Sequence, residues 1–171
     1  YDLEDIVKGR ATIKQALVQD KVSPLLYLLP ASLRIEVTDI NENYMTSIVN
    51  QLNADFDYII IDSPAGIEKG FFNAIKNARE AIVVLTLDKT SLRDGDKVIG
   101  LLKNNQINDI KLVINRYNKR DESQLSLAEV ERIMDVEIIA KIPESKDIKS
   151  EQNYGLLITK NSDADIAFKN L

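Results

Sequence analysis

The sequence predicts an α/β protein in which a mostly parallel sheet is flanked by helices on both faces. Residues 58–61 and 81–87 are apolar runs rich in β-branched side chains, which is typical of interior strands of a parallel sheet. The segments between such runs place apolar residues at helical intervals. Strands and helices therefore alternate along the chain, as in βαβ units. No repeat, low-complexity segment or linker interrupts this order, so we expect a single domain over residues 1–171.

Each element is predicted from its own local pattern. Gly9 separates two groups of apolar residues near the start, so we expect two short helices there. Ser126 followed by Glu129 has capping-box spacing, which predicts where a later helix begins. In chain order, the predicted elements are two short helices within 1–18, a buried strand at 25–29, a helix at 39–52, a buried interior strand at 58–61, a helix at 68–78, a strand at 81–87, a helix at 90–103, a strand at 110–115, a helix at 126–134, a strand at 136–142, and helices at 146–154 and 163–171.

The composition excludes several kinds of site. The 171 residues include neither Cys nor His, which excludes a disulfide framework, thiol chemistry, Ser-His and Cys-His nucleophile schemes and His-zinc sites. The net charge of −5 argues against a general nucleic-acid surface, because such a surface needs a basic face. No apolar run approaches the roughly 18 residues of a membrane-spanning helix, and no signal peptide is recognisable.

A carboxylate follows the apolar run at 58–61. Asp62 ends that run, and the turn at 63–66 follows before the next predicted helix. Open α/β sheets bind ligands at the carboxyl ends of their strands, so this arrangement matches a Walker B strand, whose Asp holds Mg²⁺ for a nucleoside triphosphate. A buried strand that merely ends in a turn-forming Asp is the alternative that this motif alone leaves open.

Two further loops at strand ends carry Asn115-Arg116 and Pro143-Glu144. An Asn side chain offers one acceptor and two donors, which matches the N6/N7 edge of adenine; an Asn that satisfies a turn fits the sequence equally well. Pro143 is either a rigid wall for a flat ring or simply the end of a strand. Because the carboxyl ends of parallel strands share one edge, these loops and the Asp62 turn together predict a nucleotide site.

A set of longer motifs is spread over the chain. It comprises Y-I-I-I-D-S-P-A-G-I-E, A-I-V-V-L-T, S-L-R-D-G-D-K-V-I-G-L-L, L-V-I-N-R-Y and K-I-P-E-S, with Y-D-L-E-D-I-V-K-G-R-A-T-I-K-Q-A-L and L-Y-L-L-P-A-S near the start. These motifs resemble the deviant-Walker P-loop ATPases of the MinD/ParA family, and within it the branch that places the division septum. The resemblance covers essentially the whole chain, and its most specific parts are D-S-P-A-G and R-D-G-D-K-V-I-G-L-L.

The resemblance implies a P-loop NTPase-like fold and an ATP-hydrolysing switch that uses Mg²⁺. Asp62 would be the Walker B carboxylate, acting on Mg²⁺ through water and required for catalysis. Ser63, Pro64 and Gly66 would belong to the switch that senses the γ-phosphate and adjoins the dimer interface.

The resemblance also assigns the base pocket. Asn115 would read adenine, and Arg116 would lie beside it. Pro143 and Glu144 would line the same pocket from the next strand.

The implied partners are proteins and a membrane rather than nucleic acid. Arg93, Asp94 and Asp96 would lie on the helix that binds a division inhibitor and an activator of hydrolysis. Read without the resemblance, these three residues fit a solvated helix face with one Arg-Asp pair worth about 0.2–0.5 kcal/mol. The family also implies an ATP-dependent homodimer and a cytoplasmic protein that is peripheral on the inner face of the cell membrane. It reaches that anionic membrane through a C-terminal helix.

The chain departs from the family pattern in three places. Leu87-Asp88 stands where the family usually has Pro-Glu. The sequence has no G-x-x-x-x-G-K-S/T phosphate loop, so we expect that the first strands are missing, that the sequence is part of a longer protein and that the chain as given does not hydrolyse ATP. We also expect the C-terminal membrane helix to follow Leu171.

Two functions of different classes are left open at this point. The first is an ATP-switched, membrane-cycling ATPase that positions the septum. The second is a non-catalytic binding module that keeps the fold and the partner face. A related flagellar-number or partition ATPase is an alternative within the enzyme class.

Overall fold

The computed structural model describes residues 1–31, 42–64, 66–155, 158 and 160–171. The start of the helix expected at 39–52, and Ala65 in the turn after Asp62, lie outside the described residues. The chain divides into two compact units, Tyr1–Ala78 and Arg79–Leu171. The expected single domain stays a prediction. Within the described ranges, no helix combines the length and the apolar character needed to cross a membrane.

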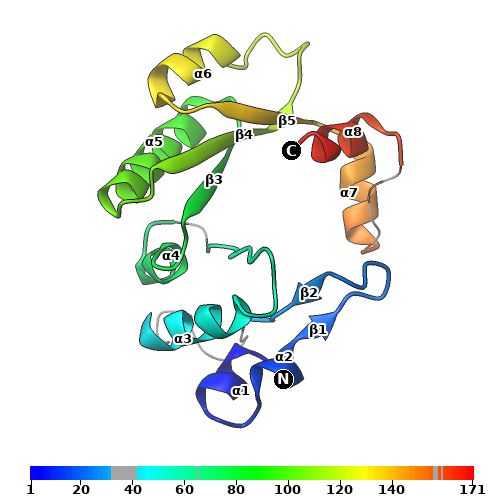
Figure 1. Cartoon of the computed structure of the whole chain (residues 1–171). Helices are drawn as coiled ribbons and strands as arrows, with labels where there is room; N and C mark the ends of the chain where they lie inside the picture. Colours follow the sequence, from blue (N-terminus) through cyan, green and yellow to red (C-terminus); the bar gives the residue numbers. More distant parts are fainter. Residues whose placement is uncertain (32–41, 65, 156–157, 159) are drawn as a thin grey trace. The chain divides into compact units, whose positions relative to one another are not determined.

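The first unit consists of short helices and one small hairpin (Figure 1). Its elements are α1 (Leu3–Val7), α2 (Ile13–Ala16), β1 (Val18–Gln19), β2 (Tyr27–Leu28), α3 (Glu42–Leu52) and α4 (Lys69–Ile75). The two short helices expected near the start are confirmed, with Gly9 between them at a φ of +69°. The strands β1 and β2 pair antiparallel.

A buried cluster joins α1 to α3 in this unit. Leu3, Ile48 and Leu52 form its centre. Partly buried side chains surround it, namely Ile6, Val7, Ile13, Leu17, Leu29, Met45, Phe56 and Ile59. The rings of Tyr27 and Phe56 meet edge to face with their centroids 5.4 Å apart, so the hairpin also contacts this cluster.

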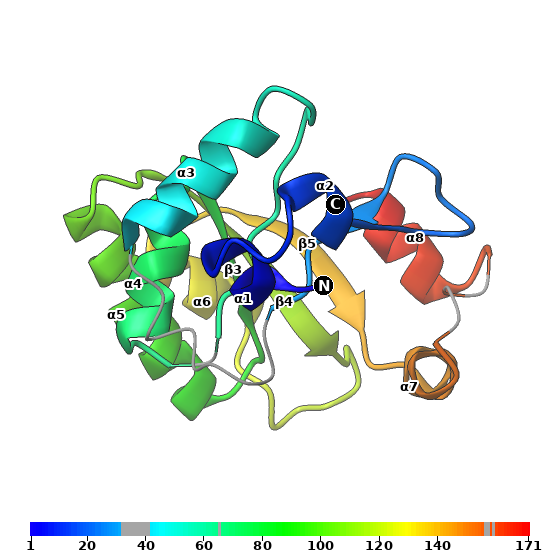
Figure 2. The same ribbon diagram turned by 90° about the horizontal axis from the view of Figure 1, so that it is seen from below.

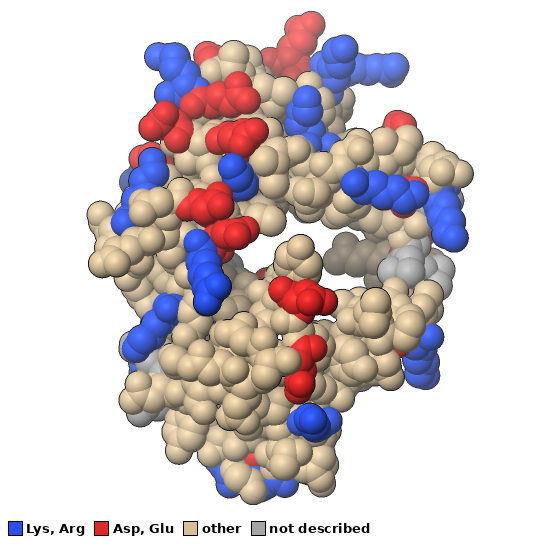
Figure 3. Space-filling model, in the orientation of Figure 1, with Lys and Arg blue, Asp and Glu red and all other residues tan. Residues whose placement is uncertain are grey.

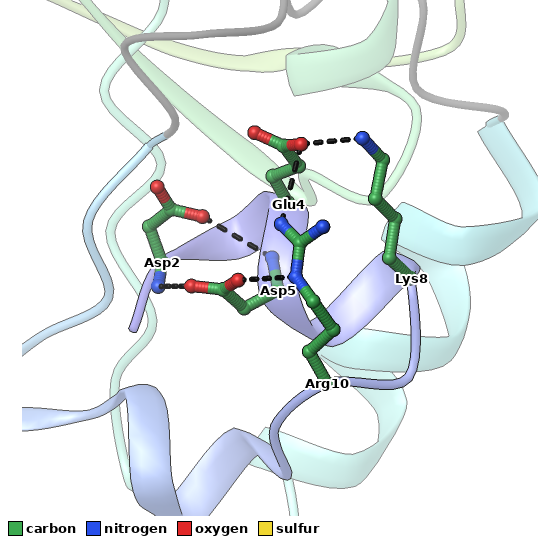
Figure 4. A network of polar contacts seen from close by, with 5 residues as sticks. All are labelled: Asp2, Glu4, Asp5, Lys8 and Arg10. Carbon is green, nitrogen blue, oxygen red and sulfur yellow. Dashed lines mark hydrogen bonds and ion pairs between the residues drawn. The ribbon is translucent and has the colours of Figure 1, made fainter.

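A compact ion-pair network holds the turn after α1 (Figure 4). Asp2 and Asp5 form a capping box at the start of the helix. The Glu4 carboxylate is 5% exposed and contacts both Lys8 and Arg10, with 3.2 Å between Glu4 Oε1 and Arg10 Nη2. Arg10 Nε also donates to Asp5 Oδ1 at 2.7 Å, and this bond lowers the pKa of Asp5. The buried carboxylate is therefore paired, as a charge with so little access to water must be.

The strand expected at 25–29 is present but not buried. It is shortened to β2, where Leu28 is 63% exposed, and the preceding Leu25 is 92% exposed. Within the described residues β2 pairs only with β1. A two-stranded hairpin has no second layer to cover its apolar side chains, so the prediction of burial is wrong.

The prediction of an interior strand at 58–61 is also wrong. The segment is irregular, and Tyr58 and Ile60 are 88% and 93% exposed. An apolar run becomes an interior strand only when neighbouring strands pair with its two edges. In the described part of the chain no strand pairs with this segment, so the local pattern is not sufficient to form one.

The second unit contains the parallel sheet. Its elements are β3 (Glu80–Leu85), α5 (Lys89–Asn104), β4 (Asp109–Tyr117), α6 (Leu127–Met134), β5 (Ile138–Pro143), α7 (Lys146–Asn153) and α8 (Asp163–Lys169). The strand order is β3-β4-β5, and both pairs are parallel. Every element expected after residue 80 is present, with its ends shifted by a few residues at most.

One face of this sheet packs against α5, which in turn contacts α6. Side chains alternate along β4, so Leu112 and Ile114 share one face, and both are completely buried. Leu85 lies beside Ile114 in the register of β3 with β4. A Cβ on Gly95 of α5 would lie 2.5 Å from a Leu85 methyl group, so the helix approaches the sheet as closely as glycine permits.

The opposite face packs against α8. Val113, Ala140 and Ile142 form its buried cluster, with Ile148 and Ala167 against it. Figures 1 and 2 both show the strands between α5 and α8. The predicted α/β class, with a parallel sheet and helices on both faces, is confirmed. On β3, which is an edge strand within the described residues, Ile82 and Val84 are more than half exposed.

The helix beginnings in this unit follow the sequence. Ser126 and Glu129 form the predicted capping box at the start of α6. Figure 3 shows acidic and basic side chains interspersed over the region where α5 and α6 lie, which agrees with the mixed charge of the sequence.

Candidate functional site

The ends of β4 and β5 meet at one edge of the sheet. Tyr117 lies opposite Pro143 in the strand register, and the N–H of Glu144 donates to the carbonyl of Tyr117 at 3.0 Å. Asn115 and Arg116 precede Tyr117, so the two loops that carry the predicted base-pocket residues are adjacent. This part of the predicted edge is confirmed. The roles of the residues stay predictions.

Asn115 is half-buried at this edge. Its Oδ1 accepts a hydrogen bond from the N–H of Arg116 at 2.9 Å. Its amide nitrogen has no hydrogen-bond partner among the described residues, so two donors remain available. A backbone N–H can donate to the oxygen of an amide side chain but not to its NH₂ group. The bond from Arg116 therefore fixes the orientation of the Asn115 amide, with Oδ1 toward the Arg116 backbone.

The backbone of Arg116 is in an unusual conformation. Its φ is +53°, in the left-handed region, which costs a residue with a side chain about 1–2 kcal/mol. Its carbonyl accepts from Gln124 Nε2 at 3.2 Å, while its side chain is exposed. The sequence did not single out Gln124, because a lone Gln in a polar loop carries no recognisable signal.

Glu144 and its neighbours complete this edge. The Glu144 carboxylate is exposed and lies 3.6 Å from Lys149 of α7. Ser145 caps α7, its hydroxyl accepting from the N–H of Asp147 at 3.1 Å. The rim beside Pro143 is thus formed by an ordered helix start.

The turn that carries Asp62 belongs to the first unit. Asp62, Ser63 and Pro64 are exposed. Ser63 Oγ donates to the carbonyl of Pro64 at 3.3 Å, and Asp62 has no partner among the described residues. Gly66 has a φ of +92°, and the Pro64 ring lies against Gly70 of α4, where a Cβ would be 2.8 Å away. The turn is therefore tied to α4 by packing, while its polar groups face water.

The donor set at this turn fits Mg²⁺ bound together with a nucleotide. Mg²⁺ is commonly held by one or two carboxylates, with substrate phosphates and waters completing its shell. The exposed Asp62 carboxylate and the adjacent Ser63 hydroxyl are donors of that kind. In the described residues no cluster of three His, Cys, Asp or Glu side chains forms a site that would hold a metal by itself.

The loop from β3 to α5 carries the Leu87-Asp88 departure. Asp88 is the N-cap of α5, its Oδ1 accepting from the N–H groups of Thr90 and Ser91 at 3.1 and 2.9 Å. The Thr86 hydroxyl donates to its other oxygen, and this bond, followed by those from the backbone, lowers the pKa of Asp88. Leu87 is buried. Asp88 is thus a structural cap and not a free carboxylate.

The predicted partner face lies on α5. Arg93, Asp94 and Asp96 are all exposed, and Asp94 lies 3.9 Å from Lys97. The expected Arg-Asp pair does not form among the described residues of this helix; Asp94 pairs with Lys97 instead. Lys97 lies one helical turn after Asp94 on the same face of the helix.

Asp62 and Asn115 lie in different units. Their placement at one common edge therefore stays a prediction. The structure brings together the four base-pocket residues and, separately, the residues of the turn at Asp62.

Similarity to curated proteins extends over the whole chain. The septum site-determining protein MinD of Thermotoga maritima is 41% identical over 179 residues, which cover 100% of this chain and 66% of that protein. The matched chain in the MinC:MinD cell division protein complex of Aquifex aeolicus is 35% identical, with a TM-score of 0.90, over 99% of this chain and 70% of that chain. The chain belongs to the MinD family. No family model matches it.

A third MinD protein adds a bound nucleotide. The septum site-determining protein MinD of Pyrococcus horikoshii, complexed with Mg-ADP, is 26% identical with a TM-score of 0.86, over 99% of this chain and 71% of that chain. The α/β fold with a parallel sheet is therefore that of MinD structures. The chain spans 62%, 66% and 58% of the lengths of three curated MinD relatives.

Proposed function

We propose that this chain contributes to an ATP-binding, ATP-hydrolysing switch that takes part in placing the division septum. Membership of the MinD family supports the role in septum placement. The Mg-ADP in the Pyrococcus horikoshii relative supports Mg²⁺ and an adenine nucleotide as ligands. The observation in this chain that carries the proposal is the junction of the β4 and β5 ends through the bond between Glu144 and Tyr117.

Asn115 is the proposed adenine reader. Its free Nδ2 donors suit N7 of adenine, and its Oδ1 has a second lone pair for the N6 amino group. Arg116 and Glu144 form the polar rim of the proposed base pocket beside Asn115, and Pro143 supplies a rigid apolar wall. This division of work suits a flat base, which needs one hydrogen-bonding edge and an apolar face.

Asp62 is the proposed Mg²⁺ carboxylate, and Ser63, Pro64 and Gly66 are the proposed switch that senses the γ-phosphate. Bound Mg²⁺ neutralises charge that develops on the phosphate oxygens. The carboxylate of Asp62 is available because no described residue engages it. The positive φ of Gly66 gives the turn a backbone conformation that residues with side chains rarely adopt.

The proposed protein partners bind at α5. A MinC:MinD complex exists in the Aquifex aeolicus relative, which supports a partner of the MinC kind. The proposed contact face consists of Arg93, Asp94 and Asp96. An activator of hydrolysis is the second proposed partner of this face. An ATP-dependent homodimer, attachment to anionic membrane and a cytoplasmic, membrane-peripheral location complete the proposal.

Replacing Asn115 tests the proposed base site. We expect Asn115→Ala to weaken ATP binding about 5- to 150-fold, the range for one bidentate base contact of about 1–3 kcal/mol. The matched control is Asn105→Ala, at the C-cap of α5, where the side-chain amide donates to Leu101 O. Isothermal titration with Mg-ATP measures both. Equal affinities of the Asn115→Ala variant and the unmodified chain would remove Asn115 from the proposal.

Replacing Asp62 tests the catalytic part. In an active protein, we expect Asp62→Ala to abolish ATP turnover while leaving the Asn115 contact to adenine in place. Unchanged turnover in this variant would contradict the role proposed for Asp62.

A second function is favoured by one observation. The helix α5 is complete and capped, whereas the segment before Asp62 has no strand partner in the described residues. A binding module that uses α5 without nucleotide chemistry would show this contrast. Partner binding that is unaffected by Mg-ATP and by Asn115→Ala would support the binding module over the switch.

A further inference from the structure

One side chain outside the sheet holds the backbone at Arg116. Gln124 lies in the loop between β4 and α6; its Nε2 donates to the carbonyl of Arg116, and its Oε1 accepts from the N–H of Asn118, both at 3.2 Å. The amide of Gln124 therefore uses both of its ends on the backbone that follows Asn115. It bridges the carbonyl of one residue and the N–H two residues later.

Gln124 is itself anchored by the loop backbone. The N–H of Gln124 donates to the carbonyl of Asp121 at 3.2 Å, and the N–H of Asp121 donates to the carbonyl of Asn118 at 3.1 Å. The next residue, Leu125, donates to the carbonyl of Leu87 at 3.1 Å. The Gln124 side chain thus extends from a fixed point and does not follow a free loop.

The contacts form a chain that ends at the proposed base reader. Gln124 holds the Arg116 carbonyl, Arg116 keeps its left-handed φ of +53°, and its N–H holds Asn115 Oδ1 at 2.9 Å. On the other side of the strand, Glu144 N–H holds the next carbonyl, that of Tyr117. The short segment after Asn115 is therefore held from both sides, by β5 and by Gln124.

We infer that Gln124 is a positioning residue that sets the orientation of the Asn115 amide, and with it the preference of the site for adenine over guanine. The inference rests on the proposed adenine site. Adenine presents N7 as an acceptor and N6 as a donor, whereas guanine presents two acceptors, N7 and O6. An amide fixed with its oxygen toward one side fits the first pattern only, and an amide free to turn distinguishes the two less well.

Two variants of Gln124 separate its two hydrogen bonds. Gln124→Met removes both bonds at similar size, and Gln124→Glu keeps an acceptor for Asn118 but cannot donate to Arg116. We expect both to reduce the ratio of ADP affinity to GDP affinity about three- to tenfold, as the loss of one or two hydrogen bonds implies. Ser123→Ala is the matched control in the same loop. The Ser123 hydroxyl donates to Asp121 and not to the Arg116 carbonyl, so we expect the affinity ratio to stay unchanged.

The experiment uses the whole chain, with Mg-ADP and Mg-GDP titrated calorimetrically. Amide NMR spectra without nucleotide supply an independent signal. We expect the chemical shifts of the Arg116 N–H and of the Asn115 side-chain amide to change in both Gln124 variants and to remain unchanged in Ser123→Ala. Far-UV circular dichroism checks that each variant is folded.

The outcomes distinguish this inference from the proposed function. The inference is overturned if the ratio of ADP affinity to GDP affinity in Gln124→Met equals that of the unmodified chain. The same ratio in Gln124→Glu and in the unmodified chain would also overturn it. An unmodified chain that shows no preference for ADP refutes the proposed adenine site instead. If the chain shows no such preference, the NMR spectra still test the positioning role. Unchanged chemical shifts of the Arg116 N–H and the Asn115 side chain in the Gln124 variants would overturn it.

Discussion

Asp62 and Asp88 are aspartates that follow apolar segments, and their surroundings differ. Asp88 accepts three hydrogen bonds, from the Thr86 hydroxyl and from two backbone N–H groups at the start of α5. Asp62 is exposed and has no partner among the described residues. A carboxylate that already caps a helix has little capacity left for a cation, so Asp62 is the better candidate for Mg²⁺.

Replacing Asp88 tests its role as a cap. We expect Asp88→Ala to lower the free energy of unfolding by about 1 kcal/mol at pH 7, because two N–H groups of α5 lose their acceptor. Asp88→Asn is the matched control, since Asn also caps helices, and we expect it to lose clearly less. Urea unfolding followed by circular dichroism measures both.

The same cap predicts a dependence on pH. Its hydrogen bonds hold the pKa of Asp88 below the ordinary value of 3.8, so the folded state favours the charged form. A lowered folded-state pKa gives stability that is present above pH 3.8 and is lost as the pH falls through the folded-state pKa. The difference between the unmodified chain and Asp88→Asn should therefore shrink in that acidic range; a constant difference would contradict the cap.

At the scale of elements, α5 has two faces with different tasks. Gly95 faces Leu85 of β3, whereas Gly100 has open space where its Cβ would be. The exposed side carries Arg93 and Asp96, the proposed partner contacts. Close packing on one face keeps the other face in a fixed orientation for a partner.

The two glycines of α5 make a matched pair of substitutions. We expect Gly95→Ala to destabilise the chain by about 1–3 kcal/mol, because the new Cβ would lie 2.5 Å from Leu85 in the buried sheet face. We expect Gly100→Ala to stabilise it by about 0.5–1 kcal/mol, because alanine favours the helix and nothing obstructs it. Urea midpoints for both variants test this; equal shifts would contradict the close approach of α5 to β3.

At the scale of the whole molecule, the proposed adenine reader and the proposed Mg²⁺ carboxylate lie in different compact units. Asn115 lies in the unit that contains the parallel sheet, and Asp62 lies in the other. The strand β4 is paired on both sides, whereas the segment 58–61 has no strand partner in the described residues. We therefore expect the backbone at Asn115 to be locally more stable than the backbone at Asp62.

Hydrogen exchange measures this difference directly. We expect the amides of Leu112, Val113 and Ile114 to exchange among the slowest, because they lie in the buried central strand. We expect the amides of residues 58–62 to exchange among the fastest, because no ladder bond from the described residues protects them. Mass spectrometry of peptides from each segment reads both. Strong protection of 58–62 would show that this segment pairs with a strand in solution.

Part of the candidate site was predictable from the sequence. Asn115 and Pro143 each stand at the end of an apolar run, and adjacent parallel strands place such ends together, as the register of Tyr117 with Pro143 confirms. Gln124 was not predictable, because its contacts join residues eight and six positions away through a loop without a local pattern.

The sequence by itself determined the local elements. The helices α5 and α6 and the strands β3 to β5 follow from periodicity and caps such as Ser126 with Glu129, because these signals act within a few residues. Only the tertiary structure decided which apolar runs are covered. Tyr58 and Ile60 of the run at 58–61, and the strand β2, look buried in sequence and are exposed in the structure, because burial and strand pairing need partners that no local pattern can supply.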